Sequence, residues 1–307
     1  MRPTRAYRHY VSGVGTPFTE IGRTEAEPFG GPAGAGGEAR IIYGLIQVLN
    51  SVHAFVNNQR VRFTLKQTAA LCSDTRVSAM SQDAANRQQR LTPEQKILDD
   101  LGLDGGLVGA DDRSFLGAKL DGDRRKFFTG EAIKLRQQIL TRESRPKIAA
   151  VYIDVFGFSR GAAQARVFVT WLHDLMLQGG QLFGIPSYVR MLGLFDTVAS
   201  VGVTNAIGSA GHNAWATARD LRIHGEVKNC VHYVALHELR TNFLADSVAQ
   251  DQGDLMPPPT ASSSTARART ATSVVATRRA NRARDSCWSR SIHATRRMGR
   301  VRCPMTD

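Results

Sequence analysis

The chain has 307 residues, of which 42% are hydrophobic, enough apolar material for the core of one large domain or two small ones. The formal net charge is +13, but residues 257–307 carry +9 of it, since eleven arginines stand there against two aspartates. The remaining 256 residues are only mildly basic, so the charge does not indicate a nucleic-acid-binding fold, and we expect no nucleic-acid partner.

Cysteine spacing and hydropathy exclude further classes of protein. The four cysteines form no CxxC pair and lack the spacing of metal ligands, so we expect neither a metal site nor a cofactor. The same spacing predicts that the chain is made in a reducing compartment. The first residues lack the apolar core of a signal peptide, and no segment approaches the roughly 18 apolar residues of a membrane span. The chain is therefore expected to be soluble and cytoplasmic when made.

The N-terminal part predicts one strand and one long helix. Residues 10–18 indicate a strand that runs into a glycine-rich loop, and residues 29–37 indicate a flexible surface loop. Residues 41–56 predict a helix, because their apolar side chains recur on one stripe. His53 lies near this stripe, where a lone histidine is more often a packing residue than a ligand.

The next ninety residues predict two further helices. Residues 92–95 have the form of a capping box with proline at the first helical position, which predicts a short helix through Leu101. Residues 124–126, Arg-Arg-Lys beside two phenylalanines, could bind phosphate, but such a run is more often a solvated face with a hydrophobic anchor. Residues 131–140 predict the helix that precedes the next strand.

Residues 147–172 indicate a buried strand, a tight turn and an amphipathic helix. The apolar run up to the turn is typical of a parallel strand buried on both faces. The turn is Gly157-Phe158-Ser159-Arg160-Gly161, the Gly-x-Ser-x-Gly form of a nucleophile elbow. We interpret Ser159 as a nucleophile, with Gly157 and Gly161 removing side chains that would collide there. The alternative is a glycine-rich turn whose serine only caps the helix.

Two later segments repeat the alternation of strand and helix. Residues 188–195 predict a strand that ends at Asp196, and residues 230–236 predict another. Such alternation predicts an α/β fold, a mostly parallel sheet with helices on both faces. Reactive residues in these sheets gather beyond the carboxyl ends of the strands, where both Ser159 and Asp196 fall.

These positions suit acyl transfer by a serine. A serine hydroxyl needs a histidine as base and a carboxylate to hold that histidine, and α/β-hydrolases place them in the order Ser, Asp or Glu, His. Asp196 suits the acid, although an aspartate here could also shape a turn. The backbone N–H of Arg160 would give one oxyanion donor at the helix start, and the second must come from a loop near the first strand.

Four blocks together resemble one known family. They are YVSGVGTPFTEIG (10–22), GFSRGAAQARVF (157–168), LGLFDTVASVG (192–202) and HYVALHELRTNF (232–243). Over residues 7–246 the chain resembles the α/β-hydrolase domain family that includes the type VI secretion phospholipase effectors. The resemblance implies an α/β-hydrolase-like fold, Ser159 as nucleophile, Asp196 as acid, and hydrolysis of phospholipid acyl esters through an acyl-enzyme.

The same resemblance implies partners and a location. The substrate would be a phospholipid membrane surface, and the protein partners would be a secretion-system spike or adaptor protein and a cognate immunity protein. By resemblance the chain would be exported through a type VI system into target cells.

The chain departs from the family pattern at both ends. The family's first strand with its Phe-Asp-Gly-Thr-like loop is not found before residue 10, and its Gly-x-His-Ser-Asp-like stretch is not found after residue 243. Beyond residue 237 the only histidine is His293, whose surroundings do not match. His232 is a weak candidate for the catalytic base, because the family has a strand at that position.

The C-terminal segment differs from the rest of the chain. Residues 257–307 are rich in Arg, Ala, Ser and Thr and have no apolar periodicity, which predicts a disordered tail. Its abrupt start indicates a shifted reading frame or a decayed copy, so we expect an incomplete fold. Two functions stay open, a carboxylic ester hydrolase and a catalytically inactive interaction protein that keeps the hydrolase fold.

Overall fold

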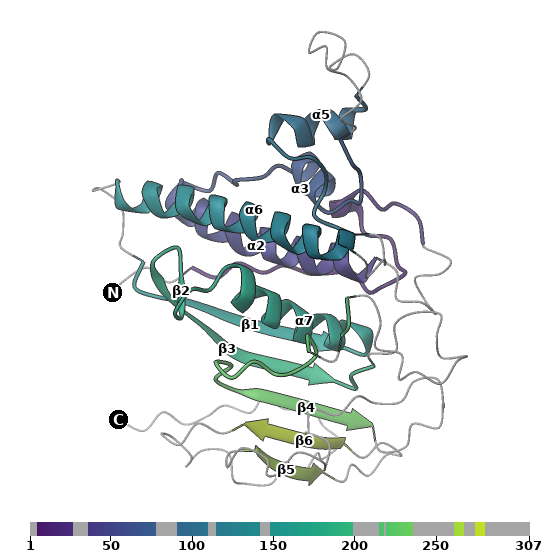
Figure 1. Ribbon diagram of the computed structural model, residues 1–307. Coiled ribbons are helices and arrows are strands. Elements are labelled where there is room, and N and C mark those ends of the chain that lie inside the picture. The colour runs from purple at the N-terminus through teal and green to yellow at the C-terminus, as the bar shows by residue number, and fades with distance from the viewer. Residues whose placement is uncertain are drawn as a thin grey trace.

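The computed structural model describes residues 5–26, 36–77, 91–109, 115–141, 148–198, 215–217, 219–235, 261–266 and 274–279 (Figure 1). Of residues 115–121, 235, 261–266 and 274–279 only the backbone is described. The helices and strands, in chain order, are η1 (Thr19–Ile21), α2 (Gly37–Val56), α3 (Leu65–Leu71), α5 (Pro93–Asp100), α6 (Phe115–Leu140), β1 (Val151–Phe158), α7 (Arg160–Leu175), β2 (Gln181–Leu182), β3 (Ile185–Phe195), β4 (Cys230–Ala235), β5 (Ala261–Ala266) and β6 (Val274–Arg279).

The sheet runs in the order β1-β3-β4-β6-β5. Strands β1, β3 and β4 pair in parallel, whereas β6 pairs antiparallel with β4 and with β5, and the short β2 pairs antiparallel with β3. The predicted α/β class with a mostly parallel central sheet is thereby confirmed. Strands β5 and β6 fall within the predicted tail, and the other tail residues lie outside the described part of the chain.

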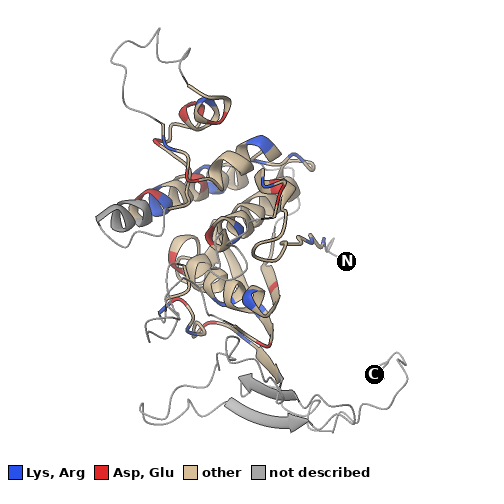
Figure 2. Cartoon of the chain, turned by 90° about the vertical axis from the view of Figure 1, so that its right-hand side faces the viewer, with Lys and Arg blue, Asp and Glu red and all other residues tan. Residues whose placement is uncertain are grey.

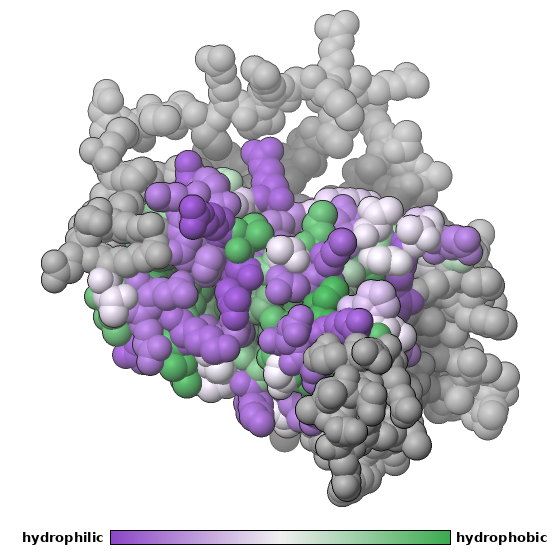
Figure 3. All heavy atoms as spheres, turned by 90° about the horizontal axis from the view of Figure 1, so that it is seen from above, coloured by the Kyte–Doolittle hydropathy of each residue, from purple (hydrophilic) through white to green (hydrophobic). Residues whose placement is uncertain are grey.

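Helix α7 connects β1 to β3 and packs on one face of both strands, with α2 and α6 beside it (Figure 1). The core between them contains Val169 and Leu172 of α7 and Val189, Leu192 and Leu194 of β3, all nearly inaccessible to solvent. On the outer side of the helices, seen from above, the described surface is mostly hydrophilic, with apolar residues scattered between (Figure 3). One layer of helices thus covers one face of the sheet.

The other face of β1 is open among the described residues. Accessibility alternates along this strand, so Tyr152, Phe156 and Phe158 are exposed on the face opposite α7. The prediction of a strand buried on both faces is therefore wrong for β1. Helices were predicted on both faces, and the described helices lie on one: α7 connects β1 to β3 there, and the described residues Trp215, Ala216 and Leu221 of the β3-to-β4 connection pack against it.

Four predicted helices are confirmed, among them α7 (Arg160–Leu175) of the stretch 147–172. The predicted helix 41–56 begins earlier, as α2 (Gly37–Val56), and the helix 131–140 is the end of the longer α6. Helix α5 has the expected capping box, in which Thr92 Oγ1 accepts from Gln95 N–H and Gln95 Oε1 accepts from Thr92 N–H. By length and composition α2 could cross a membrane, but most of it is buried inside the structure.

The basic run in α6 is only partly a solvated face. Phe127 and Phe128 are buried, as expected of a hydrophobic anchor. Arg124, however, is also buried, since its Nε donates to Leu107 O at 2.7 Å, its guanidinium pairs with Glu38, and it lies 4.7 Å above the Trp171 ring. The interpretation of residue 124 as solvated is therefore wrong, and its cation holds α2, α6 and α7 together.

Residues 10–18 form a loop with a turn at residues 14–15, so the predicted glycine-rich loop is present but the predicted strand is not. Thr16 N–H donates to Gly13 O at 3.1 Å, and buried Arg40 donates to the carbonyls of Ser12, Thr16 and Gly36 at 2.6–3.0 Å. In a strand, the Ser12 and Thr16 carbonyls would accept hydrogen bonds from a neighbouring strand. Here they accept from the Arg40 guanidinium instead. Burial lowers the pKa of Arg40 to about 10, and the side chain remains a cation at neutral pH.

Replacement of Arg40 by Met should destabilise the protein by about 3–5 kcal/mol, because three carbonyls would lose a charged donor. The measurement is the free energy of unfolding in urea. The control is Arg219→Met, whose guanidinium is exposed and pairs with Asp174 at 3.0 Å, with an expected loss under about 1 kcal/mol. Similar losses in the two variants would contradict a special role for Arg40.

Stability should also depend on pH through a histidine pair. In the last turn of α7, His173 stacks on His224 with ring centroids 3.8 Å apart, near Asp174, Glu226 and Lys228. Burial and then the neighbouring His224 lower the pKa of His173 to about 4, below its ordinary 6.5. The folded state therefore favours the neutral ring, and this stabilisation is present above pH 6.5 and is lost as pH falls through about 4.

Wild type should thus lose about 1–2 kcal/mol more stability than His173→Phe between pH 7 and pH 4.5. Phenylalanine keeps the stacked ring but takes up no proton. Chemical unfolding at the two pH values measures the difference, and parallel losses in both proteins would show that His173 is not responsible.

Candidate active site

The turn between β1 and α7 holds Ser159 in a strained backbone conformation. Ser159 has φ 54° and ψ −122°, and positive φ is uncommon for a residue with a side chain. Such strain persists only where the surrounding structure enforces it, and it is characteristic of the sharp strand-to-helix turn in a nucleophile elbow. A simple helix-capping serine has extended backbone and accepts a hydrogen bond through its side chain, and Ser159 does neither.

The two glycines of the motif differ in what they permit. A Cβ on Gly157 would lie 2.2 Å from Gly161 O, so this position must be glycine for β1 and α7 to approach so closely. A Cβ on Gly161 would meet nothing within 4 Å. The expectation that both glycines avoid a collision is therefore right for Gly157 and wrong for Gly161.

The turn after β3 is bonded directly to the turn after β1. Ser159 N–H donates to Phe195 O at 2.8 Å, and Val198 N–H donates back to Ser159 O at 3.2 Å. Asp196 lies between these contacts with φ 50°, and its N–H donates to Tyr233 O of β4 at 2.6 Å. Ser159 and Asp196 are thus brought to adjacent strand ends at the carboxyl edge of the sheet, where the sequence places both.

Figure 2 looks toward this edge from the right-hand side of Figure 1 and shows basic and acidic residues interspersed over the described helices. Near the elbow the guanidinium of Arg160 is half-buried, and burial lowers its pKa. Arg160 is the first residue of α7 and lies at the positive end of the helix dipole. An anion formed beside Ser159 would therefore be stabilised at this helix end.

The loop at residues 12–16 is connected to the start of α7. Gln164 of α7 donates to Gly37 O at 3.1 Å, and Arg40, one turn along α2, holds the loop carbonyls. Val14 of the loop belongs to the same buried cluster as Ala163 of α7. The loop thus packs against α7, and a second oxyanion donor from a loop near the first strand stays a prediction.

His232, the weak candidate for the base, is fully buried in β4. Its Nε2 lies 3.3 Å from the backbone N of Thr197 and accepts that N–H, so this nitrogen carries no proton while the bond exists. The ring thus holds the turn that carries Asp196. This contact does not favour His232 as the group that takes the proton of Ser159, and His237 and His293 lie outside the described residues.

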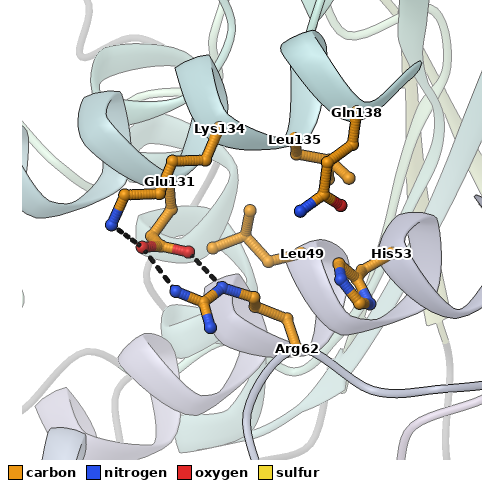
Figure 4. A pocket seen from close by; sticks show the side chains of 7 residues that line it. All are labelled: Leu49, His53, Arg62, Glu131, Lys134, Leu135 and Gln138. Carbon is orange, nitrogen blue, oxygen red and sulfur yellow. Dashed lines mark hydrogen bonds and ion pairs between the residues drawn. The ribbon is translucent and has the colours of Figure 1, made fainter. Parts of the chain in front are cut away.

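A small pocket lies elsewhere, between α2 and α6 (Figure 4). Glu131 there binds Arg62 at 2.6 Å and Lys134 at 2.8 Å, and these partners hold the pKa of its carboxyl below the ordinary value although burial opposes them. His53, across the pocket, bonds to Arg60 O at 2.7 Å through Nδ1. These groups are satisfied by one another, which favours a structural role, as expected for His53.

Within the described ranges, no group of three or more His, Cys, Asp or Glu side chains is arranged to hold a metal ion. The sequence analysis did not predict the exposed aromatic side chains of β1. Tyr152, Phe156 and Phe158 lie on one face of this strand. The spacing of two and four residues between these aromatics was the available signal.

The parallel sheet, the strained serine after β1 and the aspartate after the adjacent strand define an α/β-hydrolase-like protein. Residues 180–268 match the family model described as "T6SS, Phospholipase effector Tle1-like, catalytic domain". These residues contain the last two of the four sequence blocks, and over them the chain resembles the phospholipase effectors of type VI secretion systems, which confirms the family resemblance there. The matched range contains Asp196 and His232 and begins after Ser159.

One solved structure that resembles the chain is the "Crystal structure of an uncharacterized protein from Pseudomonas aeruginosa", with 28% sequence identity and a TM-score of 0.55. The similarity covers 76% of this chain and 30% of that chain, so the chain spans under a third of the length of that protein. A search of curated proteins finds no significant match.

The two elbow glycines should respond differently to alanine. Gly157→Ala should lower stability by roughly 2–4 kcal/mol, or displace α7, because its Cβ would overlap the Gly161 carbonyl. Gly161→Ala should be neutral or stabilise by up to about 1 kcal/mol, because it adds no contact and alanine favours a helix. Thermal unfolding of both variants measures this, and equal destabilisation would show that the elbow is not packed as described.

Proposed function

We propose that the chain is the catalytic part of a serine hydrolase, a phospholipase A-like effector of a type VI secretion system that acts on phospholipid acyl esters. The observation that carries this proposal is the strained backbone of Ser159, hydrogen-bonded to the turn that holds Asp196. The family match at residues 180–268 supports the lipid substrate class. The catalytic unit proposed from sequence spans residues 7–246, followed by a tail at 257–307.

In the proposed reaction, Ser159 Oγ attacks the ester carbonyl and passes its proton to a histidine. The backbone N–H of Arg160 donates to the oxyanion of the tetrahedral intermediate, and the N-terminal end of α7 adds its dipole. Collapse of the intermediate breaks the ester bond, releases the lysophospholipid as an alcohol that takes the proton, and leaves an acyl-Ser159 ester. Water then attacks this ester with the same base, which releases the fatty acid.

Asp196 has the supporting role in this scheme. Its carboxylate would orient the histidine and stabilise the imidazolium that forms when Ser159 loses its proton. The turn that presents it is fixed from two sides, by Ser159 of the elbow and by Tyr233 and His232 of β4. The histidine itself is not assigned among the described residues.

The second candidate is a catalytically inactive interaction protein with the hydrolase fold. The observation that favours it is the bond from Thr197 N–H to His232 Nε2, which engages the one histidine weighed as a base among the described residues with the backbone. A chain without a base would keep a positioned hydroxyl at Ser159 but would not activate it.

The remaining functional assignments also rest on the family match. We propose a phospholipid membrane surface as the substrate, and a secretion-system spike or adaptor protein and a cognate immunity protein as partners. The chain would be made in the cytoplasm and delivered through a type VI system into target cells. Neither a cofactor nor a nucleic-acid partner enters the scheme.

Ser159→Ala should lower the hydrolysis of a fluorescent phosphatidylcholine about 10³-fold or more, because the nucleophile is lost. Asp196→Asn should lower it strongly as well, with Asp100→Asn, an exposed aspartate at the end of α5, as an unaffected control. Labelling by a fluorophosphonate probe measures the reactivity of the serine separately. Hydrolysis that persists in Ser159→Ala would refute the assignment, and a wild type that neither hydrolyses the ester nor reacts with the probe would favour the inactive interaction protein.

A further inference from the structure

The interior of β4 contains a histidine where an apolar side chain would be expected. His232 is completely buried, and so is Leu194, its partner on β3. A buried imidazole is retained in a core when a hydrogen-bond partner satisfies it. That partner is the backbone N–H of Thr197, whose nitrogen lies 3.3 Å from Nε2 in the turn that follows β3. His232 therefore joins the interior of one strand to the turn at the end of its neighbour.

The direction of this hydrogen bond defines the state of the ring. Since Thr197 N–H donates, Nε2 presents its lone pair, and the neutral ring carries its single proton on Nδ1. A proton on Nε2 would face the proton of the Thr197 amide and break the contact. A general base needs its lone pair directed at the hydroxyl that it deprotonates. The lone pair of His232 is directed at the backbone instead, so a role other than that of the base remains for this ring.

Strand β4 holds both peptide groups that flank Asp196. The N–H of Asp196 itself donates to Tyr233 O at 2.6 Å, and the N–H of Thr197, in the next peptide group, donates to His232 Nε2. His232 and Tyr233 are consecutive residues, so one short piece of β4 binds the backbone on both sides of one Cα atom. With both planar peptide groups fixed, the φ and ψ angles of Asp196 are fixed, and with them the direction of its Cα–Cβ bond. The positive φ of 50° at Asp196 is held in this way.

The same turn is bonded to the nucleophile. The carbonyl of Phe195 and the N–H of Asp196 belong to one peptide group, and this carbonyl accepts Ser159 N–H at 2.8 Å. Further along the turn, Val198 N–H donates to Ser159 O at 3.2 Å. Ser159 therefore holds the turn at two points, and His232 holds the peptide group between them. Without His232 this middle peptide group could rotate while both bonds to Ser159 persist, and the Asp196 side chain would move with it.

We infer that His232 is a positioning residue for Ser159 and Asp196: through its Nε2 lone pair it fixes the peptide group after Asp196 and thereby aims the Asp196 carboxylate. The inference rests on the proposed function for the reaction that this aim serves. Misplacement of a group at an active site by about 1 Å lowers the rate on the order of 10²-fold. The ring is fully buried and so does not contact the substrate. Its loss should therefore slow the chemical step and leave substrate binding unchanged.

Two substitutions of His232 separate positioning from proton transfer. His232→Gln brings Oε1 to the place of Nε2 and can accept the Thr197 N–H, but its amide takes up no proton at neutral pH. His232→Leu fills a similar volume without an acceptor. In hydrolysis of a fluorescent phosphatidylcholine, His232→Leu should lower kcat about 100-fold with KM within about twofold of wild type. His232→Gln should keep kcat within about fivefold of wild type, because the acceptor is restored.

The matched control is Ser187→Ala, at the opposite end of β3 from Asp196. It removes a buried side-chain hydrogen bond, from Ser187 Oγ to Ile185 O at 2.9 Å, and should lower the melting temperature with kcat unchanged. A fall in kcat like that of His232→Leu would show that any weakening of the sheet has this effect, which overturns the proposal. Equal kcat in the two His232 variants overturns it as well. A loss shared by both indicates that His232 is the base, and wild-type rates in both indicate a role in stability alone.

The ring can also be observed in the wild type, which keeps the proposal testable if His232→Leu does not fold. Nitrogen NMR of the histidine rings, with the His232 signals assigned by their absence from His232→Gln, should show a proton on Nδ1 and none on Nε2. A proton on Nε2 at neutral pH, in either the neutral or the cationic ring, overturns the proposal.

The proposal and the proposed function can fail separately. A wild type that neither hydrolyses the ester nor reacts with a fluorophosphonate probe refutes the enzyme, and amide hydrogen exchange then decides whether His232 holds the turn. The amides of Asp196, Thr197 and Val198 should exchange about tenfold or more faster in folded His232→Leu than in His232→Gln. Equal exchange in the two variants overturns the proposal, whether or not the chain is an enzyme. Hydrolysis that persists in Ser159→Ala refutes only the proposed function.

Discussion

The positive φ of Ser159 is the constraint on which the arrangement at the sheet edge depends. A residue in such a region costs about 1–3 kcal/mol, so the contacts around it must compensate. They do so in three ways. Gly157 lets α7 approach β1, the Phe195 carbonyl receives the Ser159 N–H, and the Ser159 carbonyl receives the amides of Val198 and Ala162. β1 and β3 are parallel neighbours that pair up to their last residues, Phe158 and Phe195. The hydrogen-bonding partners of Ser159 therefore lie next to it.

The same bonds make the elbow and the aspartate turn a single unit. A movement of Asp196 away from the elbow would break the bonds of Ser159 to Phe195 and of Val198 to Ser159 together. His232 adds a third restraint through Thr197, from a strand that is itself paired with β3. A hydrolase needs its nucleophile and acid fixed relative to one another, and an inactive descendant would keep this network for stability alone. The network therefore supports the fold under both candidate functions. The reactivity of the Ser159 hydroxyl is the property that distinguishes the hydrolase from the inactive interaction protein.

Local patterns in the sequence were sufficient where the structure is local. The elbow, the capping box of α5 and the stripe of α2 each follow from residues within one or two turns of each other, and the edge position of Asp196 follows from parallel connectivity. Contacts between residues far apart in the chain could not be predicted from the sequence. Arg40 reaches carbonyls 24 and 28 residues away and turns an expected strand into a loop, and His232 bonds to a backbone amide 35 residues away. Burial of Arg124 likewise depends on Trp171 and Glu38, which no spacing within α6 reveals.

The open face of the sheet explains why the apolar run before the elbow was misinterpreted. Tyr, Phe and Phe alternate with inward-facing Val and Ile, so the segment is apolar throughout although only one of its faces is in the core. Asp154 distinguishes the two cases, because it lies on the same face as the rings and forms an exposed ion pair with Arg190. Burying this pair would cost several kcal/mol per ion, so its exposure agrees with a β1 face that lies outside the core. A charge among the rings also opposes edge-to-edge association of β1, since β1 pairs with β3 alone among the described strands.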